Sequence, residues 1–226
     1  MTITPFALIV GAYLFGAIPT AYLVARWLRG IDIRKYGSGN IGASNLSEHT
    51  SKWVGILLGT FDSIGKGTIP IVLANLLGQS LAIQAGVGLA AVVGHNWSPY
   101  LRFTGGRGIA TTIGIMFAFV MWKEVLLGIL LLGIIGSWWL KDTAFWTFAI
   151  VVALPGLAYF FGRPPEVVNL FAALAVVLLV KRLTGNWDWQ RGQEGRTRVF
   201  ISRLLWDRDV RGQEEWTRRG IKEKAK

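Results

Sequence analysis

Residues 4–26 read TPFALIVGAYLFGAIPTAYLVAR, with no charged side chain before Arg26. About 20 apolar residues in a helix cross the hydrocarbon core of a bilayer, so this stretch is long enough to span. No basic segment precedes it, which argues against a cleavable signal peptide. The stretch therefore predicts a first transmembrane helix.

Hydropathy predicts further spans of the same kind along the chain. The composition, 52% hydrophobic with 28 glycines and 11 tryptophans, is typical of a polytopic membrane protein. The expected spans are 53–78, 80–101, 108–122, 124–140, 144–161 and 166–183. The span at 53–78 is long and contains two charged residues, so it is expected to be broken or partly interfacial. Residues 108–140 can also be read as a single span. The expected fold is an all-α integral membrane protein of about seven transmembrane helices.

The distribution of Lys and Arg predicts the orientation, because short cytoplasmic loops carry an excess of positive charge. With the N-terminus outside, only two basic residues fall in outer connections, Lys123 and Arg163. The inner loops then hold Arg26, Arg29, Arg34, Lys35, Lys52, Arg102, Arg107 and Lys141. This predicts a multi-pass membrane protein with its N-terminus outside and its C-terminus in the cytoplasm. Both glycine-rich loops of the chain then face the cytoplasm.

A membrane domain over 1–184 and a basic cytoplasmic tail over 185–226 are the expected divisions. The tail follows the last apolar segment, and 13 of the 24 Lys and Arg residues lie after position 180. Such a tail favours contact with anionic lipid headgroups over nucleic acid. Arg191-Gly192-Gln193-Glu194 recurs as Arg211-Gly212-Gln213-Glu214, and the apolar residues at 199–206 between the copies predict an amphipathic interfacial helix. A solvated extension is the alternative.

Several chemistries are excluded by residue counts. The chain has no cysteine, which removes disulfides, thiolate catalysis and cysteine-ligated metals. Its two histidines, His49 and His95, are too few for a histidine metal cluster. No metal site built from cysteine or histidine is therefore expected.

The first glycine-rich loop is Gly37-Ser38-Gly39-Asn40-Ile41-Gly42-Ala43-Ser44-Asn45. Its glycines allow positive φ and a close approach of the backbone to a ligand. Consecutive N–H groups in such a loop bind anions, particularly where a helix begins just after it. The Ser and Asn side chains add neutral donors that suit phosphate or glycerol hydroxyls. An ordinary turn is the alternative reading.

The second loop is Thr104-Gly105-Gly106-Arg107-Gly108, which leads into a predicted helix with Thr111 on its first turns. A glycine-rich turn, a cation and a helix N-terminus together can form a phosphate site. The spacing and the Lys-Ser/Thr ending of a Walker A motif are absent. Arg107 can also be read as a positive-inside anchor.

Charged and titratable residues inside the predicted spans are further candidates. Asp62 and Lys66 are four residues apart on one helical face, where an ion pair lowers the cost of burying both. Intramembrane charges are functional candidates by default. His95, near the end of the third span, is either a general base or a hydrogen-bonding structural residue.

In order, these segments resemble the bacterial acyl-phosphate:glycerol-3-phosphate acyltransferases, the PlsY family. The matching residues run from about 16 to 115. They are Gly16-Ala17-Ile18-Pro19-Thr20, Gly30-Ile31-Asp32-Ile33-Arg34, the first glycine-rich loop, Lys66-Gly67, Pro70, Gly94-His95 and Gly105-Gly106-Arg107-Gly108-Ile109-Ala110-Thr111. From 116 to 185 the resemblance rests on hydropathy, and the tail lies outside it.

The resemblance implies a seven-helix membrane enzyme that transfers an acyl group from acyl phosphate to the sn-1 hydroxyl of glycerol 3-phosphate, without a cofactor. It implies that the catalytic residues are Ser38, Asn40 and His95. The residues that would bind substrate or phosphate are Gly39, Gly42, Ser44, Asn45, Lys66, Gly105, Gly106, Arg107, Gly108, Thr111 and Arg182. Because acyl phosphate is already activated, positioning and charge stabilisation can supply much of the rate.

The chain departs from the family pattern at several positions. Arg107 replaces the usual lysine of the second loop, and Glu48 stands where a basic residue is expected. Asp62 precedes Lys66 by four residues rather than three. Val176 and Leu179 stand where the family has a polar pair before Arg182-Leu183.

These departures favour an alternative, a homologue that binds a lipid or phosphate ligand and has lost or changed the reaction. A third reading is a small-solute transporter. Polar loops confined to one membrane face, with no inverted repeat, argue against transport. An assay for lysophosphatidate formation separates the first reading from the other two.

Overall fold

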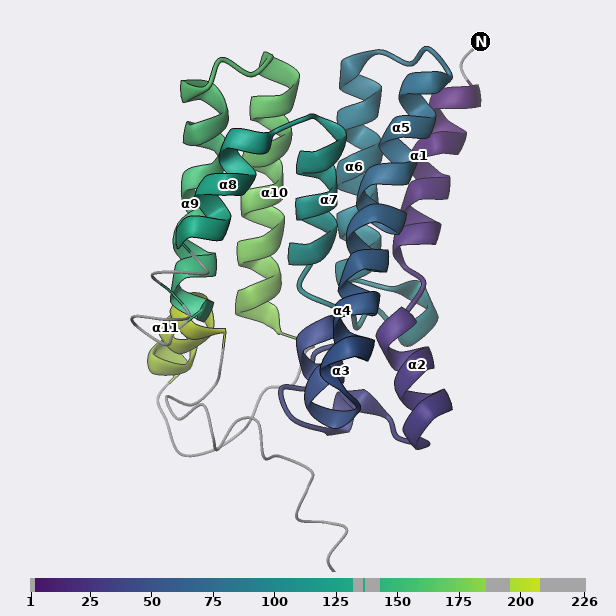
Figure 1. Cartoon of the computed structure of the whole chain (residues 1–226), viewed down its shortest axis with the longest axis vertical. Helices are drawn as coiled ribbons and strands as arrows, with labels where there is room; N and C mark the ends of the chain where they lie inside the picture. The colour runs from purple at the N-terminus through teal and green to yellow at the C-terminus, as the bar shows by residue number, and fades with distance from the viewer. Residues whose placement is uncertain (1–2, 132–135, 137–142, 186–195, 208–226) are drawn as a thin grey trace, which may run out of the picture.

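The computed structural model describes residues 3–131, 136, 143–185 and 196–207. Its long helices run up and down the longest axis of the molecule, with the N-terminus at one end (Figure 1). Among the described residues, four helical segments are long and apolar enough to cross a membrane: Thr4–Arg29, Lys52–Leu76, Thr143–Phe160 and Pro165–Thr184. Large apolar side chains such as Trp27, Leu76 and Phe160 are exposed on the outer surface, as lipid contact requires. The prediction of an all-helical membrane protein is confirmed.

The first predicted span is interrupted near its middle. α1 covers Ile3–Gly16 and α2 covers Thr20–Arg29. Pro19 lies between them, and because it has no backbone N–H the helical hydrogen-bond ladder ends there. The carbonyl groups just before it are thereby available to other parts of the protein, where irregular backbone covered by protein is tolerated at membrane depth.

The second predicted span is continuous but contains a wider turn. α4 (Lys52–Thr60), η2 (Phe61–Thr68) and α5 (Ile69–Leu76) follow one another without a break. η2 is π-helical, a form that is rare and frequent at functional sites. It carries both charged residues of the span, Asp62 and Lys66, each only 1% exposed. The charges therefore lie inside the bundle.

The remaining spans correspond to helices that alternate in direction (Figure 1). They are α6 (Leu81–Asn96), α7 (Ile109–Ala118), α8 (Trp122–Ile129), α9 (Thr143–Phe160) and α10 (Pro165–Thr184). A turn at Val120, where φ is +54°, separates α7 from α8, so 108–140 is not a single span. Residues 132–135 and 137–140 of the span expected at 124–140 lie outside the described residues.

Glycines bring the central helices into backbone contact. A Cβ added to Gly16 of α1 or to Gly94 of α6 would strike the backbone of the facing helix. The same holds for Gly67 of η2 and Gly114 of α7. Small residues at helix crossings are the usual means of close packing in membranes. These contacts fix the positions of η2, which carries Asp62, of α6, which carries His95, and of α7, which follows the second glycine-rich loop.

The short elements gather at the end of the bundle away from the N-terminus (Figure 1). They are η1 (Ile33–Lys35), α3 (Ala43–His49), η3 (Pro99–Leu101) and, from the tail, α11 (Arg196–Trp206). α11 packs against α9 and α10, with Ser202 and Arg203 each 4% exposed. The two copies of the sequence repeat on either side of it, at 191–194 and 211–214, lie outside the described residues.

Candidate functional site

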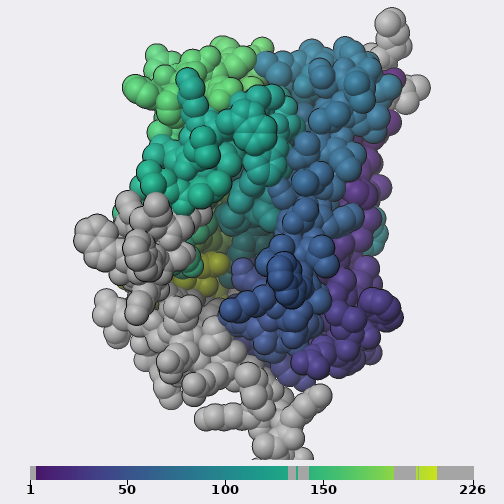
Figure 2. Space-filling model, viewed as in Figure 1, coloured from purple at the N-terminus to yellow at the C-terminus, as the bar shows by residue number. Residues whose placement is uncertain are grey.

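A cavity of about 400 Å³ opens at the end of the bundle that carries α3 and α11. Figure 2 shows a recess there, in which yellow atoms of α11 are visible between the blue atoms of α3 and α4 and the teal atoms of α7 and α8. Polar lining residues come from the first glycine-rich loop and α3: Ser38, Asn40, Ser44, Asn45 and Glu48. Apolar ones come from α7, α9 and α10: Ile109, Ile113, Val151 and Leu178. The cavity is therefore amphipathic.

Asn45 holds the first loop in shape. Its Nδ2 group donates to the backbone carbonyls of Ile33, Tyr36 and Asn40, at 3.3, 3.0 and 3.0 Å. The Asn40 backbone N–H in turn donates to Ser38 Oγ at 3.3 Å. Because Asn45 is 2% exposed and its Nδ2 group donates to these carbonyls, Asn45 positions Ser38 and Asn40 at the cavity wall.

Asn40 carries a buried polar atom that suits a ligand. Its Oδ1 has no hydrogen-bond partner among the described residues. A buried acceptor without a partner costs about 1–3 kcal/mol, so a ligand hydroxyl that donates to it would recover that cost. Asn40 is therefore placed to accept a hydrogen bond from a bound alcohol.

The glycines of the second loop are required by the end of α6. A Cβ on Gly106 would collide with His95 Nε2, and one on Gly105 would collide with the carbonyls of His95 and Asn96. The Gly106 backbone N–H donates to the His95 carbonyl at 3.0 Å. The absence of side chains at these two positions thus lets the loop lie directly on His95. Gly108, with φ at +74°, directs the chain into α7.

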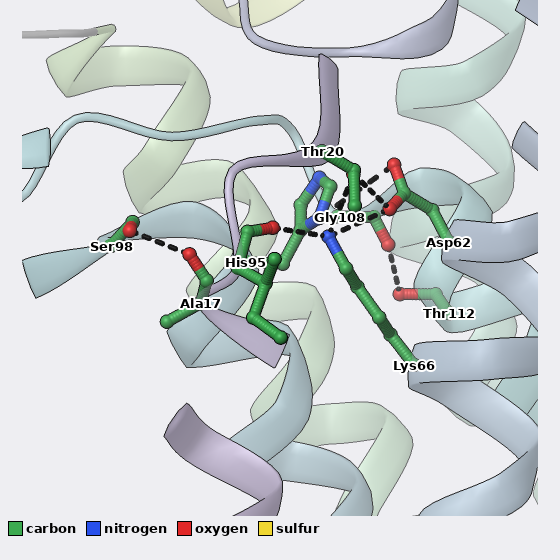
Figure 3. Close-up of polar contacts among 9 residues, drawn as sticks. Ala17, Thr20, Asp62, Lys66, His95, Ser98, Gly108 and Thr112 are labelled. Atoms are coloured by element: carbon green, nitrogen blue, oxygen red, sulfur yellow. Dashed lines mark hydrogen bonds and ion pairs between the residues drawn. The ribbon is translucent and has the colours of Figure 1, made fainter. Parts of the chain in front are cut away.

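Asp62, Lys66 and Thr20 form a buried network beside the cavity (Figure 3). Lys66 Nζ lies 2.7 Å from Asp62 Oδ1 and donates to the Ile18 carbonyl at 2.7 Å and to Thr20 Oγ1 at 3.0 Å. The Thr20 hydroxyl donates to Asp62 Oδ1 at 3.0 Å. The Ile18 carbonyl is one of those freed by the break between α1 and α2. All three ammonium protons of Lys66 therefore have protein acceptors.

His95 connects this network to the cavity. Its Nδ1 lies 4.0 Å from Asp62 Oδ2, and both residues line the cavity, whereas Lys66 lies behind them. In Figure 3 the imidazole stands beside the Lys66–Asp62 pair. An imidazole close to a buried carboxylate is a candidate proton-transfer group.

Two arginines line the cavity with different partners. Arg182, 6% exposed, donates to the carbonyls of Leu204 and Ala144, each at 2.7 Å, and so ties α10 to α11 and α9. Arg107 donates from Nη1 to the Lys181 carbonyl at 3.1 Å, and its Nε lies 3.0 Å from Asp207 Oδ1. The Arg107 charge thus faces a carboxylate at the cavity wall.

Glu48 of α3 contributes a further acid to the cavity, besides Asp62 and Asp207. Burial raises the pKa of its carboxyl group, and the neighbouring His49 opposes that rise. The residue expected to be basic in the family pattern therefore lines the cavity as an acid. By contrast, Val176 lies on the outer face of α10, 62% exposed, so its apolar character does not affect the cavity.

Nine of the residues predicted from the sequence line this one cavity. They are Ser38, Asn40, Gly42, Ser44, Asn45, His95, Arg107, Gly108 and Arg182. Gly105, Gly106 and Lys66 border a small neighbouring pocket that also contains His95. Gly39, with φ at +66°, shapes the first loop, and Thr111 is fully buried on α7. The two loops and Arg182, far apart in sequence, thus meet in space.

Thr20, Trp206 and Asp207 are among the residues at the site that the sequence reasoning missed. Thr20 could have been noticed because it follows Pro19, where a helix restarts and its first side chains are available for polar contacts. Trp206 and Asp207 line the cavity from the tail, and no local pattern signals that a segment after the last span returns to the bundle.

Comparison with known proteins identifies relatives of this chain. A family model of glycerol-3-phosphate acyltransferases matches residues 6–188. Glycerol-3-phosphate acyltransferase 4 of Dehalococcoides mccartyi (strain CBDB1) is 41% identical over 218 residues, covering 94% of this chain and 92% of the relative. Glycerol-3-phosphate acyltransferase 5 of another strain of that species is 37% identical, covering 97% and 95%.

A solved structure also resembles the fold. The crystal structure of PlsY, an integral membrane glycerol 3-phosphate acyltransferase, in its glycerol 3-phosphate form is 28% identical with a TM-score of 0.71. The match covers 79% of this chain and 88% of that one. PlsY in its lysophosphatidic acid form matches with a TM-score of 0.69.

Proposed function

The chain belongs to the glycerol-3-phosphate acyltransferase family, and we propose that it transfers a fatty acyl group from acyl phosphate to the sn-1 hydroxyl of glycerol 3-phosphate. The products are lysophosphatidic acid and inorganic phosphate. The reaction is an acylation step of phospholipid synthesis. PlsY, the similar protein of known structure, was crystallised in forms with glycerol 3-phosphate and with lysophosphatidic acid.

The observation that carries this proposal is the amphipathic lining of one cavity. The acceptor is small, polar and anionic, whereas the donor ends in a long apolar chain. The polar wall from the first loop suits the acceptor, and Ile113, Val151 and Leu178 suit the first methylenes of an acyl chain. A cavity with both kinds of wall can hold the two reacting groups in contact, which supplies much of the rate of a transfer reaction.

The proposed chemistry needs no nucleophile from the protein. The sn-1 oxygen attacks the acyl carbonyl carbon, the bond from that carbon to the phosphate oxygen breaks, and the hydroxyl proton leaves on the phosphate. Ser38 and Asn40 would orient the glycerol hydroxyls, and Arg107 would bind a phosphate group. His95, beside Asp62, would relay the proton between hydroxyl and phosphate.

The cavity mouth is proposed to face the cytoplasm of a bacterial inner membrane. The basic loops and the C-terminal part of the described chain lie at the cavity end, whereas the N-terminus lies at the other (Figure 1). The bias of Lys and Arg toward that end agrees with a cytoplasmic location. Soluble glycerol 3-phosphate would then enter directly from the compartment in which it is found.

The test is an assay of purified protein with palmitoyl phosphate and labelled glycerol 3-phosphate, scored for lysophosphatidate. We expect product, and we expect Arg107→Ala to lower kcat/KM on the order of tenfold to a hundredfold, the usual loss of a charge-assisted hydrogen bond. Arg102→Gln, which removes an exposed charge two residues before the second loop and outside the cavity lining, should leave the rate nearly unchanged. An equal loss in both variants would refute a specific role for Arg107.

The second candidate is a homologue that binds the ligand without turnover. Glu48 at the cavity wall and the pairing of Arg107 with Asp207 favour it, because both weaken the attraction for a phosphate. Folded protein that is thermally stabilised by glycerol 3-phosphate yet forms no lysophosphatidate would support this candidate and exclude the first.

A further inference from the structure

The C-terminal helix α11 is built into the wall of the cavity. The glycerol-3-phosphate acyltransferase model ends at residue 188, before this helix begins. The matches to the two Dehalococcoides mccartyi relatives, however, cover too much of the chain to leave α11 out. The segment that forms α11 therefore lies beyond the region that the family model matches, but within the region aligned with these two relatives.

Two arginines hold α11 against α10 in a reciprocal arrangement. Arg203 of α11 donates from Nη1 to the Leu183 carbonyl at 3.2 Å, and Arg182 of α10 donates from Nη1 to the Leu204 carbonyl at 2.7 Å. Both side chains are nearly buried, at 4% and 6% exposed. This anchoring fixes the end of α11, where Trp206 and Asp207 reach the cavity.

Asp207 meets the cation that phosphate recognition would use. Its Oδ1 lies 3.0 Å from Arg107 Nε, and the side chains are 24% and 14% exposed, respectively. The other arginine of the cavity, Arg182, is committed to backbone carbonyls. A carboxylate and a phosphate offer the same kind of anionic oxygen to a guanidinium. Asp207 therefore occupies an Arg107 position that a substrate phosphate would contact.

We propose that Asp207 is an affinity-determining residue of the substrate site, which sets the KM for phosphate-bearing substrates by competing with them for Arg107. This inference rests on the proposed phosphate role of Arg107. A substrate phosphate must displace the carboxylate or share the guanidinium with it, and it also meets the repulsion of the carboxylate. Glu48 adds another negative charge to the same cavity, so removal of either Asp207 or Glu48 should strengthen phosphate binding.

Asp207 also gives a reason for arginine in place of the family's lysine at position 107. A guanidinium spreads its charge over several nitrogens, so Nη1 donates a hydrogen bond to the Lys181 carbonyl while Nε forms an ion pair with Asp207. An ammonium is a single point charge on a flexible stem. The replacement at 107 and the added acid at 207 thus belong to one arrangement.

The test measures KM for glycerol 3-phosphate and for palmitoyl phosphate in wild type and in Asp207→Asn. We expect at least one of the two KM values to fall about threefold to fivefold, the size of a partly exposed ion pair, with kcat nearly unchanged. Asp207→Glu, which keeps the charge, should stay close to wild type. Glu166→Gln, which removes an exposed acid at the far end of α10, is the matched control and should change neither KM. KM values that are unchanged or raised in Asp207→Asn would overturn the proposal.

A double-variant cycle assigns the effect to Arg107. In an Arg107→Ala background, Asp207→Asn should no longer lower KM, and a full effect there would overturn the competition. If wild type forms no lysophosphatidate, the proposed function fails but the competition remains measurable. In that case half of the maximal thermal shift should need less glycerol 3-phosphate in Asp207→Asn than in wild type, and an equal requirement would overturn the inference.

Discussion

At the scale of single residues, three cations at the site differ in whether their protein partners leave them able to bind a substrate. Lys66 has three protein acceptors for its three protons, and Arg182 donates to two backbone carbonyls. Both therefore hold segments of the bundle together. Arg107 contacts one carbonyl and one exchangeable carboxylate at the cavity wall. Arg107 is for this reason the best placed of the three to bind an incoming anion.

Glu48 should weaken the binding of glycerol 3-phosphate, because its carboxylate shares the cavity with the substrate phosphate. We expect Glu48→Gln to lower the KM for glycerol 3-phosphate by about threefold, the effect of one charge screened by water and protein. The measurement is the ratio of wild-type KM to variant KM.

The pH dependence of that ratio is a second check on Glu48. Burial raises the pKa of Glu48, so the carboxyl group gains its proton more readily as the pH falls. The neutral acid then resembles glutamine. The ratio of wild-type KM to variant KM should therefore fall toward one as the pH is lowered from 8 to about 5. Titration of the substrate phosphate affects both proteins equally and cancels in the ratio. A ratio that grows as the pH falls would contradict this role.

At the scale of elements, two irregular helices meet where the polar network lies. The break between α1 and α2 frees the Ile18 carbonyl, and the π-helical η2 carries Asp62 and Lys66 toward it. Neither irregularity would be stable in lipid, because exposed backbone groups and charges are costly there. Each supplies the partner that the other needs, so the two elements form a single structural unit beside the cavity.

Loss of one partner from this unit should cost more than loss of both. Lys66→Met leaves the Asp62 carboxylate buried without its cation, and we expect destabilisation of about 3–5 kcal/mol, seen as a lower Tm in detergent. The double variant Asp62→Asn, Lys66→Met removes both charges and should recover most of the loss. A double variant less stable than Lys66→Met would show that the charges do not act as a pair.

Activity in the same variants separates structure from chemistry. If Asp62 orients His95 for proton transfer, the stable double variant should still have a much lower kcat than wild type. Full activity in that variant would assign the network to folding alone.

Hydropathy predicted the positions of the helices better than the irregularities within them. Apolar length located the helices because a bilayer demands it, and the two loops were marked by glycines that a helix interior disfavours. The break at Pro19 was not predicted, because proline is tolerated within transmembrane helices. The contact of Arg107 with Asp207 joins residues 100 positions apart, and such a contact leaves no periodic or local pattern. The glycines at 105 and 106 were assigned to phosphate binding, whereas the structure adds a steric requirement set by His95.

At the scale of the whole molecule, the cavity lies where the apolar bundle meets its polar end elements. Both glycine-rich loops, α3 and α11 lie at that end (Figure 1), so the polar wall of the cavity and its apolar wall from α7, α9 and α10 meet there. The proposed reaction joins one substrate of each kind. Because the cavity lies at one end of the bundle, the proposed function requires that this end face the compartment that contains glycerol 3-phosphate.

The orientation can be tested directly because the chain contains no cysteine. Lys52 begins α4 near the cavity end, and Lys123 lies in α8 near the end that carries the N-terminus; both are exposed. In intact cells, a membrane-impermeant maleimide should label Lys123→Cys, whereas Lys52→Cys should react only after permeabilisation. The positive-inside bias is the physical reason, since basic loops are retained in the cytoplasm. The cysteine-free wild type controls for background. The opposite labelling pattern would place the cavity outside the cell, away from cytoplasmic glycerol 3-phosphate, and would contradict both the orientation and the proposed route of substrate entry.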